Sequence, residues 1–237
     1  MDPEYRKYYP ELYQRHWWWR AREEAIVNQL RRLLLPHTNQ SILDIGCGNG
    51  LFFGRLQQFG SVEGIEPADE FIDPNGPYFS DIFRVPFDHS FNPNRKYSLI
   101  LMLDVLEHMD EPKEALCHCL RLLQPSGVVL ITVPAFPVLW TNHDRLNRHR
   151  TRYTKASFRR LAAEAGLQIR LLRYLFYWMF PAKLACRMKE SFFSREASVP
   201  QIPHPCINEF LYWVSRFEDS LLHAVPALRL HDKACNK

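Results

Sequence analysis

Short apolar runs alternate with longer segments of helical periodicity along most of the chain. The apolar runs predict strands at 41–45, 61–66, 78–82, 97–103, 127–133 and 166–171. Apolar spacing between and around them predicts helices at 10–35, 49–59, 155–165 and 207–224, and a further helix that has Pro112 in its first turn. Strands that alternate with helices indicate an α/β fold with a parallel sheet.

These elements predict a Rossmann-like, doubly wound domain with a mostly parallel sheet of seven strands, six being the alternative. We expect a helical lid at 1–40, a core at 41–175, and an aromatic and helical extension at 176–237 that is not a separate domain. Residues 69–77 are broken by proline and glycine, so we expect no full helix there. Residues 225–231 match a closing antiparallel strand poorly.

A glycine-rich segment follows the first predicted strand. It reads Asp44-Ile45-Gly46-Cys47-Gly48-Asn49-Gly50. Glycines allow tight turns and bring bare backbone close to a nucleotide-like ligand. The dinucleotide fingerprint G-x-G-x-x-G would need glycine at position 51, where the chain has Leu, whereas D-x-G-x-G-x-G is intact. The segment therefore favours S-adenosylmethionine over NAD.

A second acidic residue supports this interpretation. Glu66 ends the second predicted strand about 20 residues beyond the loop, where a carboxylate that binds ribose hydroxyls is expected. Together with the third and fourth predicted strands, these segments resemble the class I S-adenosylmethionine-dependent methyltransferases over roughly residues 40–170. An NAD-dependent oxidoreductase of the same architecture is disfavoured by Leu51 and by the lack of a separate substrate domain.

The resemblance implies a set of cofactor contacts. Asp44 would orient the loop and the methionine ammonium, Glu66 would hold the ribose, and the carbonyl of Leu103 would face the ammonium. Asp81 and Ile82 would meet the adenine. Relatives carry a lid helix with an arginine that meets the cofactor carboxylate, which implies Arg22 here, with Arg20 as the alternative. The complete expected set is Arg22, Asp44, Gly46, Cys47, Gly48, Gly50, Glu66, Pro67, Asp81, Ile82 and Leu103.

The segment after the fourth strand, Leu103-Asp104-Val105-Leu106-Glu107-His108, resembles the L-E-H signature of ubiquinone-pathway O-methyltransferases. In that group an E-x-x-E-H arrangement can hold a divalent metal near the acceptor hydroxyl. Here Asp104 replaces the first Glu, so we expect turnover to survive a chelator and leave the metal ligands unassigned. His108 is the expected base or acceptor contact, and a polar helix start without chemistry is the alternative.

A long segment after the fifth strand, residues 134–154, resembles a P-A-(aromatic)-P…W-x-x-H-D…H-x-R-R-Y-T pattern of a bacterial branch of these methyltransferases. Long loops at the ligand edge of a sheet are usually functional. The resemblance suggests that His143 and Asp144 pair with each other, the carboxylate orienting the imidazole as a base. It also suggests that Arg150 or Arg152 binds an anionic group of the acceptor. An ordinary polar loop is the alternative.

Composition narrows the functional classes. The chain is 46% hydrophobic and 24% charged, which is usual for a globular protein. Its formal net charge of +4 is small and scattered, so we expect no nucleic-acid partner. The six cysteines show no framework spacing, and the charged N-terminus lacks an apolar signal core, which together indicate a cytoplasmic setting. Cys117, His118 and Cys119 are expected to be ordinary helix residues.

An apolar aromatic run at 174–182 is too short to cross a bilayer, which takes about 20 residues. It is expected to line a pocket for a lipophilic acceptor, to form core, or to make peripheral membrane contact. The sequence thus predicts methyl transfer to a small, partly hydrophobic molecule, with O-methylation favoured over N- or C-methylation. A scaffold that binds the cofactor without turnover is the alternative.

Overall fold

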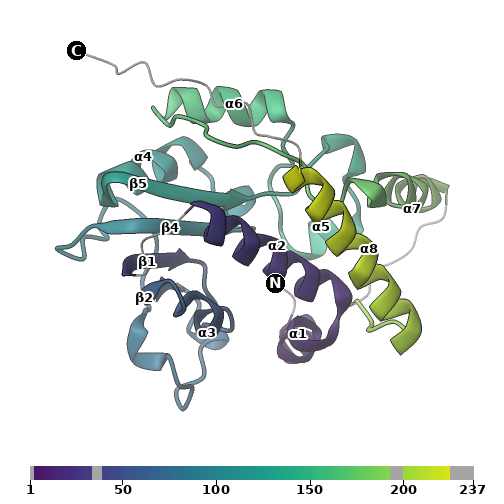
Figure 1. The fold of residues 1–237 in the computed structure, drawn as a ribbon, viewed down its shortest axis with the longest axis horizontal. Coiled ribbons are helices and arrows are strands. Elements are labelled where there is room, and N and C mark those ends of the chain that lie inside the picture. The colour runs from purple at the N-terminus through teal and green to yellow at the C-terminus, as the bar shows by residue number, and fades with distance from the viewer. Residues whose placement is uncertain (1–2, 34–38, 193–199, 225–237) are drawn as a thin grey trace.

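A sheet of five parallel strands forms the centre of the computed structural model, which describes residues 3–33, 39–192 and 200–224 (Figure 1). The strands are β1 (Gln40–Ile45), β2 (Gly60–Ile65), β3 (Ile82–Phe83), β4 (Tyr97–Leu103) and β5 (Leu123–Thr132). Their order is β3-β2-β1-β4-β5. The strand order reverses between β1 and β4, so the sheet has a switch point at which ligands of such folds bind.

Helices surround the sheet. They are α1 (Pro3–Arg15), α2 (Trp17–Leu33), α3 (Phe53–Leu56), α4 (Pro112–Leu122), α5 (Asn142–Leu146), α6 (Lys155–Glu164), α7 (Phe180–Phe192) and α8 (Pro205–Ala224). Five single 3-10 turns connect them, namely η1 (Asp69–Phe71), η2 (Phe79–Asp81), η3 (Leu106–His108), η4 (Pro137–Leu139) and η5 (Tyr177–Met179).

Both faces of the central strands are buried, because alternate residues pack into two separate cores. Ile42 and Leu99 point to one face, where Leu30 of α2 and Phe53 of α3 cover them. Residues Leu43, Ile45, Ile100 and Met102 point to the other face and pack with α4 and with Tyr153 ahead of α6. This three-layer arrangement places the carboxyl ends of the strands at one edge, beside the start of α2 (Figure 1).

The predicted helix at 10–35 is two helices that meet at His16. Two side chains cap the start of α2 at this break. Nδ1 of His16 accepts from the backbone N–H of Trp18 at 3.1 Å. Asn208 of α8 accepts from the N–H of Trp17 at 2.9 Å. The predicted helix at 49–59 shortens to α3, because Gly50 and its neighbours form turns.

The prediction of six or seven strands is wrong for the described residues. Residues 166–171 form no strand. The chain instead leaves the sheet toward α8, where Arg173 pairs with Asp219 at 3.1 Å. The predicted strand at 78–82 is mostly the turn η2, and β3 has two residues. The absence of a full helix at 69–77 is confirmed, and the predicted closing segment 225–231 lies outside the described residues.

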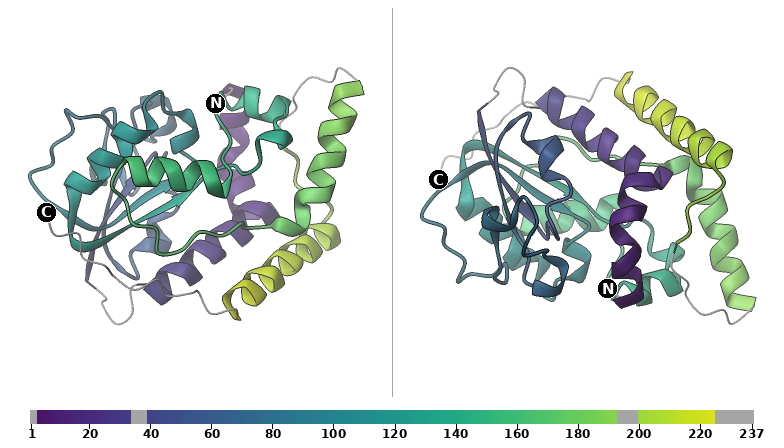
Figure 2. Two further views of the ribbon diagram at one scale, coloured as in Figure 1. Left: turned by 90° about the horizontal axis from the view of Figure 1, so that it is seen from above. Right: turned by 90° about the horizontal axis from the view of Figure 1, so that it is seen from below.

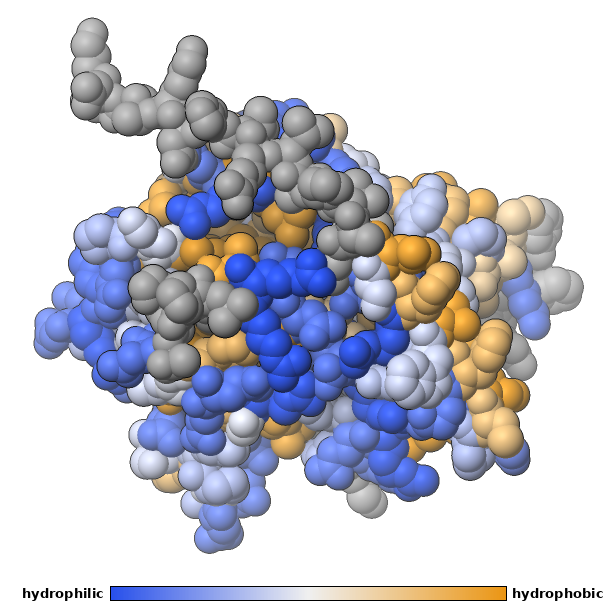
Figure 3. All heavy atoms as spheres, in the orientation of Figure 1, coloured by the Kyte–Doolittle hydropathy of each residue, from blue (hydrophilic) through white to orange (hydrophobic). Residues whose placement is uncertain are grey.

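Helix α8 is amphipathic, as predicted, but its polar face points inward. Asn208, Ser215 and Asp219 are buried against the rest of the protein. Large apolar residues are exposed on the other face, namely Ile207, Phe210, Trp213, Phe217 and Leu221. Helices α2 and α8 lie side by side (Figure 2), and apolar residues gather on the flank that carries α7 and α8 (Figure 3). No described helix is long and apolar enough to cross a membrane.

Candidate functional site

A cavity of about 1950 Å³ extends from the carboxyl ends of β1, β2, β4 and β5 along one side of β5, as far as Leu123 at the start of that strand. It is lined by the glycine loop after β1, by Glu66, by Leu103 and by the segment that follows β5. Helices α1 and α2 contribute Tyr13 and Arg22. A site for one small ligand usually occupies about 300–1,000 Å³, so the part of this cavity at the strand ends is the candidate ligand site, and the remainder runs beside β5.

The glycine loop forms one wall of the cavity. Gly46, Gly48 and Gly50 all have positive φ, at 73°, 54° and 68°. A Cβ at Gly46 would lie 2.5 Å from Cγ2 of Val105, and one at Gly50 would lie 3.2 Å from Tyr78. A Cβ at Gly48 would meet nothing within 4 Å. Gly46 and Gly50 therefore serve the turn and its packing, whereas Gly48 leaves open space that a ligand can fill.

Glu66 and Asp44 flank this loop. The Glu66 carboxylate accepts from the N–H of Gly48 at 3.1 Å and from that of Ala68 at 3.0 Å, so it fixes the loop and keeps capacity for ribose hydroxyls. Asp44 is 4% exposed, and burial raises its pKa to about 7. Burial also raises the pKa of Glu66. Two poorly solvated carboxylates at one end of a cavity suit a ligand with a cation and hydroxyls.

Arg22 reaches the cavity from α2. It pairs with Asp104 at 2.7 Å and donates to Oγ1 of Thr132 at 3.1 Å, and Thr132 in turn donates to Asp104 at 2.9 Å. Asp104 has φ of 58°, a conformation that costs a non-glycine residue energy and here is held by these two partners. The alternative, Arg20, is instead paired with Glu209 of α8. Of these two arginines of α2, Arg22 is therefore the one that lines the cavity.

The expected cofactor residues separate into two groups. Arg22, Asp44, Gly46, Cys47, Gly48, Glu66, Pro67 and Leu103 all line the cavity. Gly50, Asp81 and Ile82 do not line it. Asp81 ends the turn η2 before β3 rather than following that strand, and Ile82 is buried in the core. The residues that line this end beyond Pro67 are Glu70, Phe71, Ile72 and Asp73.

Asp144, which the sequence pairs with His143, is bonded to Arg152 and His149 in the structure. Asp144 has no exposed surface and accepts from Nε and Nη2 of Arg152 at 2.7 and 2.9 Å. Nδ1 of His149 lies 2.9 Å from the same carboxylate. His143 lines the cavity, but its Nε2 lies 2.9 Å from Nδ2 of Asn147, and burial lowers its pKa to about 4. Asp144 thus anchors Arg152 and orients His149.

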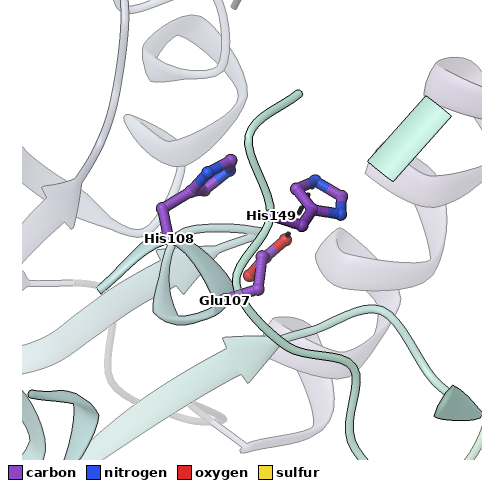
Figure 4. A group of neighbouring side chains, drawn as sticks. All are labelled: Glu107, His108 and His149. Carbon is purple, nitrogen blue, oxygen red and sulfur yellow. Dashed lines mark ion pairs between the residues drawn. The ribbon is translucent and has the colours of Figure 1, made fainter. Parts of the chain in front are cut away.

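Three side chains from two segments lie close together (Figure 4). Glu107 and His108 belong to η3, and His149 follows α5. Nε2 of His149 lies 4.0 Å from Oε1 of Glu107, and the rings of His108 and His149 are 4.9 Å apart. Burial raises the pKa of Glu107, and partial desolvation of the ring lowers that of His108, whose side chain remains exposed on one side. A carboxyl group and two imidazoles, which can all accept protons, therefore lie together at the part of the cavity next to the carboxyl end of β4.

Aromatic side chains form the wall beyond this cluster. Phe136 has φ of 61° and lies 4.4 Å from Tyr174 and 4.9 Å from Phe180, measured between ring centroids. The two arginines expected to receive an anion are already paired: Arg152 with Asp144, and Arg150 with Asp110 at 2.5 Å. Aromatic rings therefore dominate this end of the cavity, but charged side chains also line it. Nζ of Lys155 lies 4.6 Å from the centre of the Tyr174 ring, and Lys183 of α7 is a further lining residue.

Two residues of the site received no role from the sequence. His149 opens the quoted H-x-R-R-Y-T pattern, which was the available signal, but its partner is five residues away across a turn. Thr132 is the last residue of β5, and its position at a carboxyl end of the sheet is the feature that points to it. Side-chain partners across elements cannot be assigned from spacing alone.

Comparison with known proteins agrees with this geometry. Residues 18–172, more than half of the chain, match the family described as a methyltransferase domain. A ubiquinone biosynthesis O-methyltransferase of Rhodopseudomonas palustris (strain HaA2) is 28% identical over 97 residues, which cover 38% of this chain and 38% of that protein. The enzyme of that name from Vibrio campbellii is 25% identical over 148 residues, covering 56% of this chain and 63% of that protein. The chain therefore spans less than two thirds of the length of these relatives.

Two solved structures share the fold. A protein from Bacillus halodurans C-125 superposes with a TM-score of 0.51 at 17% identity, over 73% of this chain and 85% of that one. YcgJ from Bacillus subtilis also has a TM-score of 0.51, at 15% identity, over 69% and 80%. At these identities the likeness concerns the fold alone. The family match confirms the resemblance that the motifs carried: this chain belongs to the methyltransferase domain family, within the class I S-adenosylmethionine-dependent methyltransferases.

Proposed function

We propose that the chain transfers the methyl group of S-adenosylmethionine to an oxygen of a small, partly hydrophobic acceptor. The observation that carries this proposal is the pairing of the Gly46–Gly48 turn with the buried carboxylates of Asp44 and Glu66 around one cavity. In the proposed complex, Glu66 accepts from the ribose hydroxyls and Asp44 faces the methionine ammonium. Arg22 exchanges part of its contact with Asp104 for the methionine carboxylate.

The acceptor occupies the aromatic end. Phe136, Tyr174 and Phe180 offer a wall for an apolar or aromatic body. The cluster of Glu107, His108 and His149 lies where the reacting hydroxyl of such an acceptor would be. The names of the ubiquinone biosynthesis O-methyltransferase relatives, at 28% and 25% identity, support transfer to oxygen. The acceptor is therefore expected to combine a hydroxyl with an apolar framework.

In methyl transfer the main task of the protein is to align the acceptor oxygen with the methyl group of the cofactor. A sulfonium already activates its methyl group, so the rate depends on a nucleophilic oxygen held about 3 Å away in line with the leaving sulfur. A hydroxyl must also lose its proton, and the carboxylate and imidazoles of the cluster are the available acceptors. The lid formed by α1 and α2 contributes Trp17, Trp18 and Trp19 to the cavity wall and excludes water.

Peripheral membrane contact through 174–182 receives limited support. Of this segment Tyr177 is 54% exposed, whereas Phe176 is buried and Phe180 packs against Phe136. Trp178 does not line the cavity and packs near Trp17, with its ring N–H donating to Ser215 of α8 at 3.3 Å. We therefore assign most of this segment to the acceptor wall and to the attachment of α8.

The test is incubation of the protein with S-adenosylmethionine carrying a labelled methyl group and an extract that contains lipids and polar metabolites. We expect label in a product that partitions into organic solvent and whose new bond is an O-methyl ether or ester. A Glu66→Ala variant is the control, since it keeps the acceptor wall. Binding of the cofactor without label in any fraction would indicate a scaffold rather than an enzyme.

A further inference from the structure

The cluster at the end of β4 has the composition of a metal site. One carboxylate oxygen of Glu107, one ring nitrogen of His108 and one of His149 lie within 4.8 Å of one another (Figure 4). Two imidazoles and one carboxylate are a ligand set that divalent transition metals prefer, whereas magnesium favours oxygen alone. The three residues come from η3 and from the loop after α5, so the fold rather than a single helix brings them together.

The state of Glu107 is the strongest observation. Its side chain has no exposed surface, and neither carboxylate oxygen has a hydrogen-bond partner among the residues that the structure describes. A buried carboxylate without partners costs several kcal/mol, so such a group usually has a ligand or a proton. The oxygens lie beside two histidines that line the cavity. A cation between the three side chains would satisfy the carboxylate.

His149 is already oriented for coordination. Its Nδ1 lies 2.9 Å from Asp144, which leaves Nε2 directed toward Glu107 at 4.0 Å. Metal-binding histidines commonly direct their second nitrogen at a carboxylate, which fixes the ring and its tautomer. Asp144 is in turn held by Arg152. Ligand atoms on one ion are about 3–3.5 Å apart, given bonds of about 2.1 Å, so small side-chain rotations close the site.

Asp104 is outside this set, because Arg22 and Thr132 occupy its carboxylate. We propose that Glu107, His108 and His149 bind a first-row divalent transition metal at the acceptor end of the cavity. This reverses the expectation from the sequence that activity needs no metal. The inference rests on the proposed function for the role of the ion, which would supply positive charge that favours the ionised acceptor hydroxyl. With an ion bound, His108 and His149 would act as ligands rather than as bases, and the proton of the acceptor hydroxyl would pass to solvent water when the hydroxyl ionises.

Cobalt titration tests the proposal without any turnover assay. The protein is stripped with EDTA, dialysed, and titrated with Co²⁺ while visible absorption and calorimetric heat are recorded. We expect one Co²⁺ per chain, with ligand-field bands typical of nitrogen and oxygen ligands. Glu107→Gln and His108→Ala should weaken binding at least about tenfold, and Asp144→Asn by about 10–100-fold, the usual effect of losing an orienting partner. The matched control is His89→Ala, an exposed histidine outside the cavity.

Two results would overturn the proposal: equal Co²⁺ affinity in wild type, Glu107→Gln and His108→Ala, or no ligand-field bands in wild type at saturating Co²⁺. His108 is exposed, so its variant should fold even where Glu107→Gln does not. A parallel S-adenosylmethionine titration of the stripped protein separates the claims. If the protein binds S-adenosylmethionine but not Co²⁺, only the metal site is disproved. If it binds Co²⁺ but not S-adenosylmethionine, the proposed function is disproved.

Discussion

Nδ1 of His149 lies 2.9 Å from Oδ1 of Asp144, a carboxylate that has no exposed surface and that also accepts two hydrogen bonds from Arg152. The same carboxylate accepts from the backbone N–H of Thr141 at 2.8 Å and so closes the capping box at the start of α5. One side chain therefore holds the loop after β5, the helix α5 and a cavity-lining histidine in fixed positions.

Asp144→Asn should lower the free energy of unfolding by about 3–5 kcal/mol, because the guanidinium of Arg152 would remain buried without its counter-charge. These contacts hold the pKa of Asp144 well below its usual range. A lowered folded-state pKa stabilises the protein above the unfolded value of 3.8, so the difference between wild type and variant should shrink as pH falls below about 4. Urea unfolding at several pH values measures it. Glu164→Gln, which removes an exposed pair with Arg160, is the control and should change stability by less than about 0.5 kcal/mol.

Alanine at two glycines of the loop should separate folding from binding. Gly46→Ala should destabilise the protein, since its Cβ would meet Val105 at 2.5 Å and its φ is positive. Gly48→Ala should cost only the backbone penalty of about 1–2 kcal/mol but should weaken S-adenosylmethionine binding, because its Cβ enters open space in the cavity. Thermal unfolding and calorimetry with each variant report the two effects. Equal cofactor affinity in Gly48→Ala and wild type would place the ligand elsewhere.

Asp44 should make stability depend on pH in the opposite direction to Asp144. Its pKa is raised from 3.8 to about 7 by burial, so the folded state favours the protonated form. The wild type should therefore lose stability relative to Asp44→Asn as pH rises from about 4 through about 7, by up to about 4 kcal/mol. Urea unfolding at pH 5 and pH 8 checks this. Saturating S-adenosylmethionine should reduce the difference at pH 8, because its ammonium would stabilise the ionised Asp44.

The aromatic wall should determine acceptor affinity. Phe180→Ser should raise the Michaelis constant for an apolar acceptor several-fold and leave cofactor affinity unchanged, since Phe180 faces Phe136 at 4.9 Å. Trp178→Ser is a suitable comparison, because Trp178 binds α8 outside the cavity and its loss should lower stability instead. Steady-state kinetics with the acceptor found in the labelling experiment decides it. If Phe180→Ser changes only stability, this side chain is part of the core.

Local patterns were sufficient for the centre of the fold. Buried strands such as β1 and β4 were predicted within a residue or so, because their apolar runs are uninterrupted and end at turn-forming residues. The predicted strand at 166–171 does not form, although its apolar pattern is that of a strand, because strand pairing depends on a partner edge that local spacing does not specify; just beyond it, Arg173 pairs with Asp219 of α8. Helix α8 shows the same limit: its periodicity gave the helix, but only the contacts of Asn208 and Asp219 reveal which face turns inward.

The candidate site shows the same difference between positions set by local sequence and contacts set by distant segments. Residues placed by the loop after β1 and the end of β2, such as Gly48 and Glu66, were predicted because backbone spacing fixes their positions. The partner of Asp144 was not, because His143 is adjacent in sequence but α5 turns its ring toward Asn147. Asp104 stands at the first position of the E-x-x-E-H pattern, and the spacing gave no sign that Arg22 from a distant helix pairs with it.

Calorimetric titration of S-adenosylmethionine into wild type and Glu66→Ala tests the central claim most directly. We predict that the wild type binds one equivalent and that the variant loses about 1.5–3 kcal/mol of binding free energy, the worth of hydrogen bonds to a charged acceptor. Glu66→Gln, which keeps one acceptor oxygen, should lose less. An unchanged dissociation constant in Glu66→Ala, together with binding of NADH by the wild type, would contradict the assignment of this cavity to S-adenosylmethionine.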